Sequence, residues 1–304
     1  MLYQSPDLAP EGRLRLSAVL QTPLAGIAQI YFQSSPVFGA IFLLCLYLSG
    51  PALAIGCVLG VCAASATAWA VELPPGERAA GTYGYNAALA GVGVCASYQL
   101  NLALVLWIVL AGVLTSLLTH ALLRFKLVAL TIQFVLVMWL AAAIGPSLGL
   151  QPAAQNGASC GMAPLSYAFC SLGQVSFIGA APLGMVLWSA LARDRWRYGM
   201  WMLAGAAMAW CAASVGIDLM AQSDGAALAT GMGVNSVLAM LALCVHQRAW
   251  HWRVAGAALS ISLCVTFGAV GLPYYTLPFV LATWMILPLS RRTVSGSRAA
   301  VTAP

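Results

Sequence analysis

The chain has 304 residues, of which 62% are hydrophobic and only 7% are charged. A soluble domain carries about a quarter charged residues, so this composition excludes a soluble protein and indicates a polytopic membrane protein. The net charge of +6 comes from basic residues scattered singly or in pairs, which argues against a nucleic-acid partner.

The apolar runs predict two sets of five spans, since a helix needs about 20 such residues to cross the hydrocarbon of a bilayer. The first set is expected at 37–50, 52–71, 83–98, 102–121 and 127–149. The second is expected at 183–192, 199–217, 232–245, 254–271 and 275–290. We therefore divide the chain into a cytoplasmic segment (1–20), a first repeat (21–150), a second repeat (151–290) and a cytoplasmic tail (291–304).

Two short segments share a Gln–Phe pair half a molecule apart. They read IAQIYFQSSPVFG (27–39) and LGQVSFIGAAPLG (172–184). At an offset of 145 residues they match in three pairs, Gln29/Gln174, Phe32/Phe177 and Gly39/Gly184. Both are too polar and too short to cross a membrane. Because non-helical backbone survives at membrane depth only where it is sheltered, each is predicted to form a re-entrant half-helix.

The basic residues fix the expected orientation. With the N-terminus in the cytoplasm, all 13 Lys and Arg residues fall on the cytoplasmic side, as the positive-inside rule requires. Both termini are then cytoplasmic. Since five crossings is an odd number, the second repeat is inverted relative to the first.

Further matches extend the repeat. YGYNAAL (83–89) aligns with MGVNSVL (232–238), and LTIQFVLVMW (130–139) aligns with YTLPFVLATW (275–284). The predicted fold is an all-α polytopic membrane protein with two inverted-topology repeats of five transmembrane helices, each with one re-entrant half-helix. In such folds the substrate path lies between the repeats, near the membrane midplane.

The chemistry of that path follows from the residue types present. All seven acidic residues lie in predicted loops or span ends, which argues against a proton relay, although a Na⁺ site made of backbone carbonyls stays open. No nucleophile–base pair or metal-ligand spacing occurs, so we expect neither an enzyme nor a cofactor. The repeated Gln, Asn and Thr residues suit a small uncharged polar solute. Among nine Cys residues, only Cys160 and Cys170 could meet in an outer loop.

These three doubled motifs resemble the urea transporter family. Its halves each carry a GQV-F type segment, a G-Y/F-N-x-x-L segment and an L-T-x-P-F signature, and all three occur here twice, in order. The resemblance implies a bacterial urea channel, which works by facilitated diffusion in the inner membrane through one pore in each protomer of a homotrimer.

The resemblance also assigns residues to the pore. Gln29 and Gln174 would accept N–H bonds from urea at opposite ends of a slot. The walls and the central constriction would come from Phe32, Tyr85, Leu89, Thr131, Phe177, Leu238 and Thr276. Asn86 and Asn235 would hold unwound backbone near the pore.

Two positions depart from the family pattern. Gln133 replaces the signature Pro of the first half, and Val234 is the smaller counterpart of Tyr85. We therefore include short-chain amides and ammonia among the expected solutes. Two other functions stay open on the sequence, an ion-coupled secondary transporter of a small neutral solute and a membrane sensor or scaffold that does not conduct.

Overall fold

The structure is a computed structural model that describes residues 16–153, 159–216 and 225–301. These residues are almost entirely helical, with a single isolated β-bridge between Tyr98 and Pro152 among them. Five of the helices are long and apolar enough to cross a membrane. The predicted class, an all-α polytopic membrane protein, is thereby confirmed. Most of the expected segment 1–20 lies outside the described residues.

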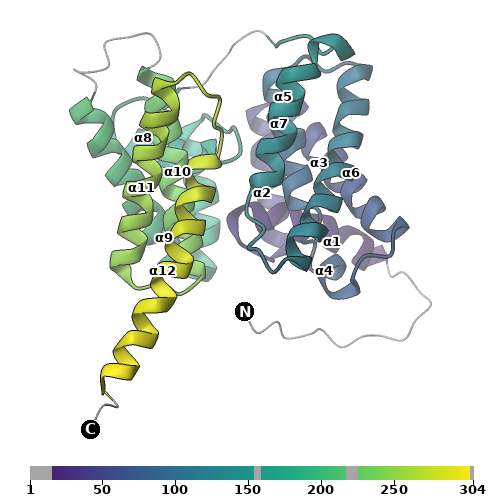
Figure 1. Cartoon of the computed structure of the whole chain (residues 1–304). Helices are drawn as coiled ribbons and strands as arrows, with labels where there is room; N and C mark the ends of the chain where they lie inside the picture. Colours follow the sequence, from purple (N-terminus) through teal and green to yellow (C-terminus); the bar gives the residue numbers. More distant parts are fainter. Residues whose placement is uncertain (1–15, 154–158, 217–224, 302–304) are drawn as a thin grey trace.

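The first half forms one of the two bundles seen side by side in Figure 1. Helix starts follow local capping: Ser35 accepts a hydrogen bond from the Phe38 N–H with Pro36 behind it, and Asn101 accepts one from the Leu104 N–H. The elements are α1 (Leu16–Ala28), η1 (Gln29–Tyr31), α2 (Pro36–Ser49), α3 (Pro51–Ala70), α4 (Pro75–Ala79), α5 (Tyr85–Ser97), α6 (Leu102–Arg124), α7 (Ile132–Ile144) and η2 (Pro146–Leu148).

The second half forms the other bundle (Figure 1). Its elements are α8 (Pro164–Gln174), α9 (Ala181–Gly216), α10 (Gly225–Val245), α11 (Trp250–Ala269) and α12 (Leu277–Val301). Helix α9 contains a break at Arg195, where φ is −141° and ψ is 62°. The short predicted span 183–192 is therefore the first arm of α9, which continues beyond the break. Arg195 is 145 residues after Gly50, which separates α2 from α3 in the first half.

Two predicted spans differ from the observed helices for a structural reason. The span expected at 127–149 is α-helical only over 132–144. Side chains of α5 bond the carbonyl of Leu130 and hold the segment before α7 out of the helix. The span expected at 275–290 begins at Leu277 and continues as a helix to Val301.

The Gly of each repeated segment lets two helices touch. A Cβ at Gly39 would lie 2.1 Å from the carbonyl oxygen of Leu24, and one at Gly184 would lie 1.9 Å from that of Phe169. Leu24 and Phe169 are themselves 145 residues apart. Small residues permit such close approach in membrane helices, so the repeated Gly packs α2 and α9 against the segments that carry the repeated Gln.

The two halves contact each other through pairs of equivalent residues. Thr131 and Thr276 share a hydrogen bond of 2.6 Å, and the Ser176 hydroxyl lies 3.2 Å from that of Tyr31; both pairs are 145 residues apart. A two-fold relation requires equivalent positions to meet on its axis. The inverted repeat stays a prediction, and these contacts have the pattern it requires.

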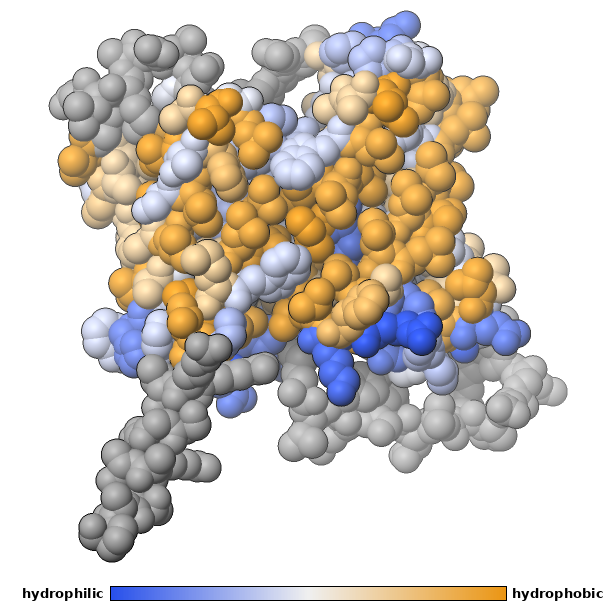
Figure 2. Space-filling view, viewed as in Figure 1, coloured by the Kyte–Doolittle hydropathy of each residue, from blue (hydrophilic) through white to orange (hydrophobic). Residues whose placement is uncertain are grey.

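The surface has the polarity of a membrane protein. Figure 2 shows a broad hydrophobic band between hydrophilic residues, which gather mainly along the lower edge. Large apolar side chains such as Leu48, Leu102 and Val215 are exposed, as expected where a helix face meets lipid rather than water.

Candidate functional site

The two Gln-bearing segments have the same backbone conformation. In each, the N–H of the Phe bonds the carbonyl of the Gln, at 2.9 Å for Phe32 and Gln29 and at 3.1 Å for Phe177 and Gln174. Both Phe residues are left-handed, with φ of 54° and 62°. Such φ values are unfavourable for a bulky side chain, so the fold imposes the same sharp turn after each Gln.

Gln29 lies at the start of η1 and is half-buried. Its side-chain amide donates a hydrogen bond to the carbonyl of Ala80, in the link between α4 and α5. An amide group has one acceptor and two donor hydrogens, so this bond fixes the Gln29 side chain and leaves its carbonyl oxygen as an acceptor. Gln174 is the last residue of α8 and is also half-buried.

Thr131 and Thr276 form the centre of the candidate site. They precede α7 and α12, they are 6% and 4% exposed, and their hydroxyls bond each other. Trp139 of α7 donates to the carbonyl of Pro273, and Trp284 of α12 donates to that of Val128. Trp139 follows Thr131 and bonds the segment before Thr276, whereas Trp284 follows Thr276 and bonds the segment before Thr131. The starts of α7 and α12 therefore pass each other in opposite directions at the Thr pair.

The aromatic residues predicted as walls differ in their contacts. Phe177 reaches across to the first half, where its ring packs 6.2 Å from that of Phe134 on α7. Tyr275 packs on the same ring at 5.8 Å, and Gly93 of α5 faces Phe177 so closely that a Cβ there would lie 3.2 Å from it. Phe32 is half-buried and packs against the same core.

The remaining candidates lie in α5 and α10. Leu89 and Leu238 are each 1% exposed in these helices. The Tyr85 hydroxyl donates to the carbonyl of Leu130, at 2.8 Å, and also contacts that of Ala129. Val234 is buried and has no such hydroxyl, so the two halves hold the segment before their Thr residues differently.

The two Asn residues are fully buried and bond the backbone before each Thr. Asn86 donates to the carbonyl of Leu130 at 3.0 Å, and Asn235 donates to that of Tyr275 at 2.9 Å. The Asn235 carbonyl oxygen also accepts from the Phe279 N–H at 3.0 Å. That of Asn86 has no partner among the described residues.

Gln133, which stands in place of the signature Pro, turns away from the Thr pair toward α6. It is fully buried, and its amide donates to the Thr119 hydroxyl at 3.1 Å. The departure therefore adds a bond between α6 and α7.

Sequence comparison of the halves did not single out Tyr31. Its hydroxyl donates to the carbonyl of Leu172 at 2.8 Å and lies beside Ser176, so it joins the two Gln-bearing segments. The residue equivalent to Tyr31 in the second half is Ser176, so the two positions are not identical and do not stand out as a repeated pair. Cys160 and Cys170 form a disulfide that joins the segment before α8 to α8 itself.

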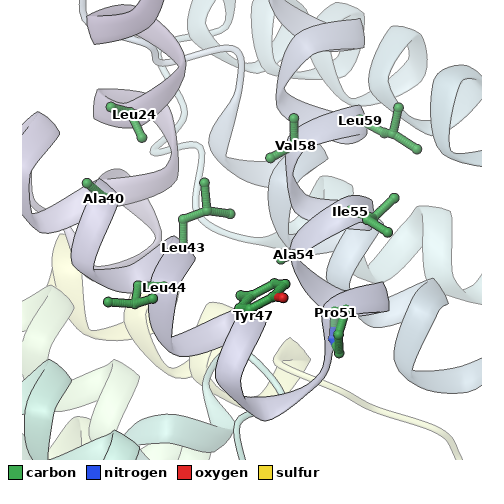
Figure 3. Close-up of a pocket in the computed structure, with 10 residues that line it drawn as sticks. All are labelled: Leu24, Ala40, Leu43, Leu44, Tyr47, Pro51, Ala54, Ile55, Val58 and Leu59. Carbon is green, nitrogen blue, oxygen red and sulfur yellow. The ribbon is translucent and has the colours of Figure 1, made fainter.

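An apolar groove lies away from these residues, between α2 and α3 (Figure 3). It has a volume of about 610 Å³, and the Tyr47 hydroxyl is the one polar side-chain group on its walls. A small polar solute needs several hydrogen-bonding partners in its site, so this groove is unsuited to such a solute.

A bundle of membrane-spanning helices whose halves meet through buried, neutral polar groups has the architecture expected of a membrane transport protein. More narrowly, the chain belongs to the urea transporter family, since the family model "Urea transporter" matches residues 20–291. No curated protein matches the chain significantly. The protein therefore transports urea across a membrane, and its family is one of transporters rather than enzymes.

Proposed function

We propose that the protein conducts urea passively, as a channel, along the contact between its two halves. The observation that carries this proposal is the hydrogen bond between Thr131 and Thr276, because it brings two buried hydroxyls together where α7 and α12 begin. A hydroxyl both donates and accepts hydrogen bonds. The pair can therefore exchange its mutual bond for bonds to the carbonyl and N–H groups of urea.

The pathway extends from this pair toward both faces of the membrane. The fixed amide of Gln29 lies beside Ala80, two residues after Arg78, at the end expected in the cytoplasm. Gln174 follows Cys170, which is tied to the outer loop. Buried Leu89 and Leu238 and the ring of Phe177 supply apolar walls. Neutral acceptors within apolar walls admit a small neutral solute and exclude hydrated ions.

The described charges favour a channel over a proton-coupled carrier. The acidic residues that the structure describes are Glu72, Glu77 and Asp194, and each lies in a short helix, a turn or beside the break in α9. Ionisable groups inside the membrane are what proton relays normally require.

We extend the proposal to a homotrimer in a bacterial inner membrane, with a separate pore in each protomer and both termini in the cytoplasm. The placement of all 13 basic residues supports this orientation, and the trimer follows from the family resemblance. Cysteine labelling of intact cells at each terminus tests the orientation, and mass measurement of the detergent-solubilised protein tests the trimer.

Transport measurements on proteoliposomes test the mechanism. We expect rapid urea flux by stopped-flow light scattering that is independent of Na⁺ and H⁺ gradients, with slower flux of acetamide. Flux that requires either gradient would favour the ion-coupled carrier, and a well-folded protein without flux would favour a sensor or scaffold. Ammonia is compared in the same vesicles with an entrapped pH dye.

A further inference from the structure

A buried guanidinium in the second half has no counter-ion among the described residues. Arg253 lies in the first turn of α11 and is only 9% exposed. Its guanidinium stacks on the ring of Trp201, with 4.7 Å between its central carbon and the ring centroid. Its Nε is buried and has no hydrogen-bond partner in the described part of the chain. The single ion pair found there joins Arg193 to Asp194.

This arrangement is costly unless an anion completes it. An Arg side chain remains charged in proteins and carries five N–H donors, and a buried charge without a partner is strongly unfavourable. The ring of Trp201 satisfies one face of the guanidinium but accepts none of its in-plane hydrogen bonds. The Nε of Arg78, which stacks on Trp69, also has no hydrogen-bond partner among the described residues, but Arg78 as a whole is partly exposed and follows Glu77 in the chain.

A second Arg lies on the same face of α9 as Trp201. Arg197 lies four residues, about one helical turn, before Trp201 in α9, and Trp201 is the residue on which Arg253 of α11 stacks. Arg197 is exposed. An Arg guanidinium recognises phosphate through planar, bidentate hydrogen bonds.

Exposed apolar side chains lie just after the break in α9 and at the start of α11. Trp196 and Met200 of α9 are 67% and 51% exposed, and Trp250 of α11 is 66% exposed. Trp residues concentrate where lipid tails meet headgroups, and hydrophilic residues of this half gather along the lower edge of the hydrophobic band (Figure 2). A ligand that fits the surface around Arg253 therefore has both a phosphate group and apolar chains.

We propose that Arg253 and Arg197, with the Trp201 ring, bind the phosphate of an anionic phospholipid headgroup from the adjoining leaflet. The acyl chains of the lipid lie along the exposed apolar side chains of α9 and α11. The site is separate from the urea pathway. The flanking motif pairs have offsets of 149 and 145 residues, which place Arg253 opposite Leu104 or Ile108 of the first half, and both of these are apolar. The lipid site therefore belongs to the second half alone.

Purified protein with added lipid tests the proposal. The wild type, Arg253→Gln and the control Arg124→Gln are titrated with phosphatidylglycerol, phosphatidylcholine or inorganic phosphate, while thermal unfolding and lipid retention by native mass spectrometry are recorded. Arg124 is an exposed residue in the last turn of α6, so its substitution removes the same charge elsewhere. Urea flux in neutral vesicles checks that each variant is folded.

We expect phosphatidylglycerol to raise the Tm of the wild type and of Arg124→Gln by about 3 °C or more over phosphatidylcholine. In Arg253→Gln this difference disappears and the affinity for phosphatidylglycerol falls about tenfold or more. In phosphatidylcholine the variant is at least as stable as the wild type, because an uncompensated charge has been removed.

Three results would overturn the proposal. Equal destabilisation of Arg253→Gln in both lipids would assign Arg253 a purely structural role. Equal stabilisation of the wild type by inorganic phosphate would assign the site to a soluble anion. Loss of a self-associated form in Arg253→Gln, without any difference between lipids, would assign the counter-ion to a carboxylate of a second copy.

Discussion

Replacing Thr131 by Val removes one of the two hydroxyls that meet between the halves. Both residues are almost fully buried and their oxygens are 2.6 Å apart. The single variant leaves the hydroxyl of Thr276 buried without this partner, which costs about 1–3 kcal/mol. The double variant Thr131→Val/Thr276→Val removes both groups together and is expected to be close to neutral. Measured couplings of this kind in membrane proteins average about 0.6 kcal/mol and reach about 1.7 kcal/mol.

Urea flux should rank the single and double variants in the opposite order from their stability. If urea takes the place of each hydroxyl's partner as it passes, every lost hydroxyl removes about 1 kcal/mol of stabilisation, or about a fivefold decrease in flux. Compared with the double variant, the single variant is then less stable but has the higher urea flux. The flux of the double variant is about 25-fold lower than that of the wild type.

Thermal unfolding in detergent and stopped-flow urea flux in proteoliposomes measure these two orders. Thr115→Val is the matched control, because the Thr115 hydroxyl is also buried but bonds the Ala111 carbonyl of its own helix at 2.8 Å. A double variant destabilised by the sum of the single effects would show that the hydroxyls do not act as a pair. Unchanged flux in the double variant would refute the role of the pair in transport.

Three further predictions concern the residues around this pair. Gln174→Ala should lower urea flux about fivefold or more, through loss of one acceptor; wild-type flux in a folded variant would remove Gln174 from the pathway. Cys160→Ser should lower the free energy of unfolding by about 2–3 kcal/mol, since the Cys160–Cys170 disulfide closes a short loop; a reductant should then destabilise the wild type but not the variant. Trp139→Phe and Trp284→Phe should each cost about 0.5–1.5 kcal/mol in unfolding measurements, because each loses one hydrogen bond between the halves; a cost confined to one of them would contradict their equivalence.

Much of the fold could be predicted from composition and repetition. Long apolar runs specify membrane helices because a bilayer leaves a chain few ways to satisfy its backbone, and every predicted span overlaps an observed helix. The residues at which the helices begin and end were less predictable. Whether residues 127–131 are helical depends on Tyr85 and Asn86, about 45 residues away, whose side chains bond the Leu130 carbonyl.

The sequence by itself determined the membrane class, the matching Gln–Phe segments, and the neutral character of the repeated polar residues. These properties are carried by residue types and their spacing along the chain. Only the tertiary structure brought Thr131 against Thr276 and Tyr31 against Ser176, and only it left Arg253 buried without a described counter-ion. Contacts between residues 145 positions apart depend on how two complete bundles pack, and no local pattern records that packing.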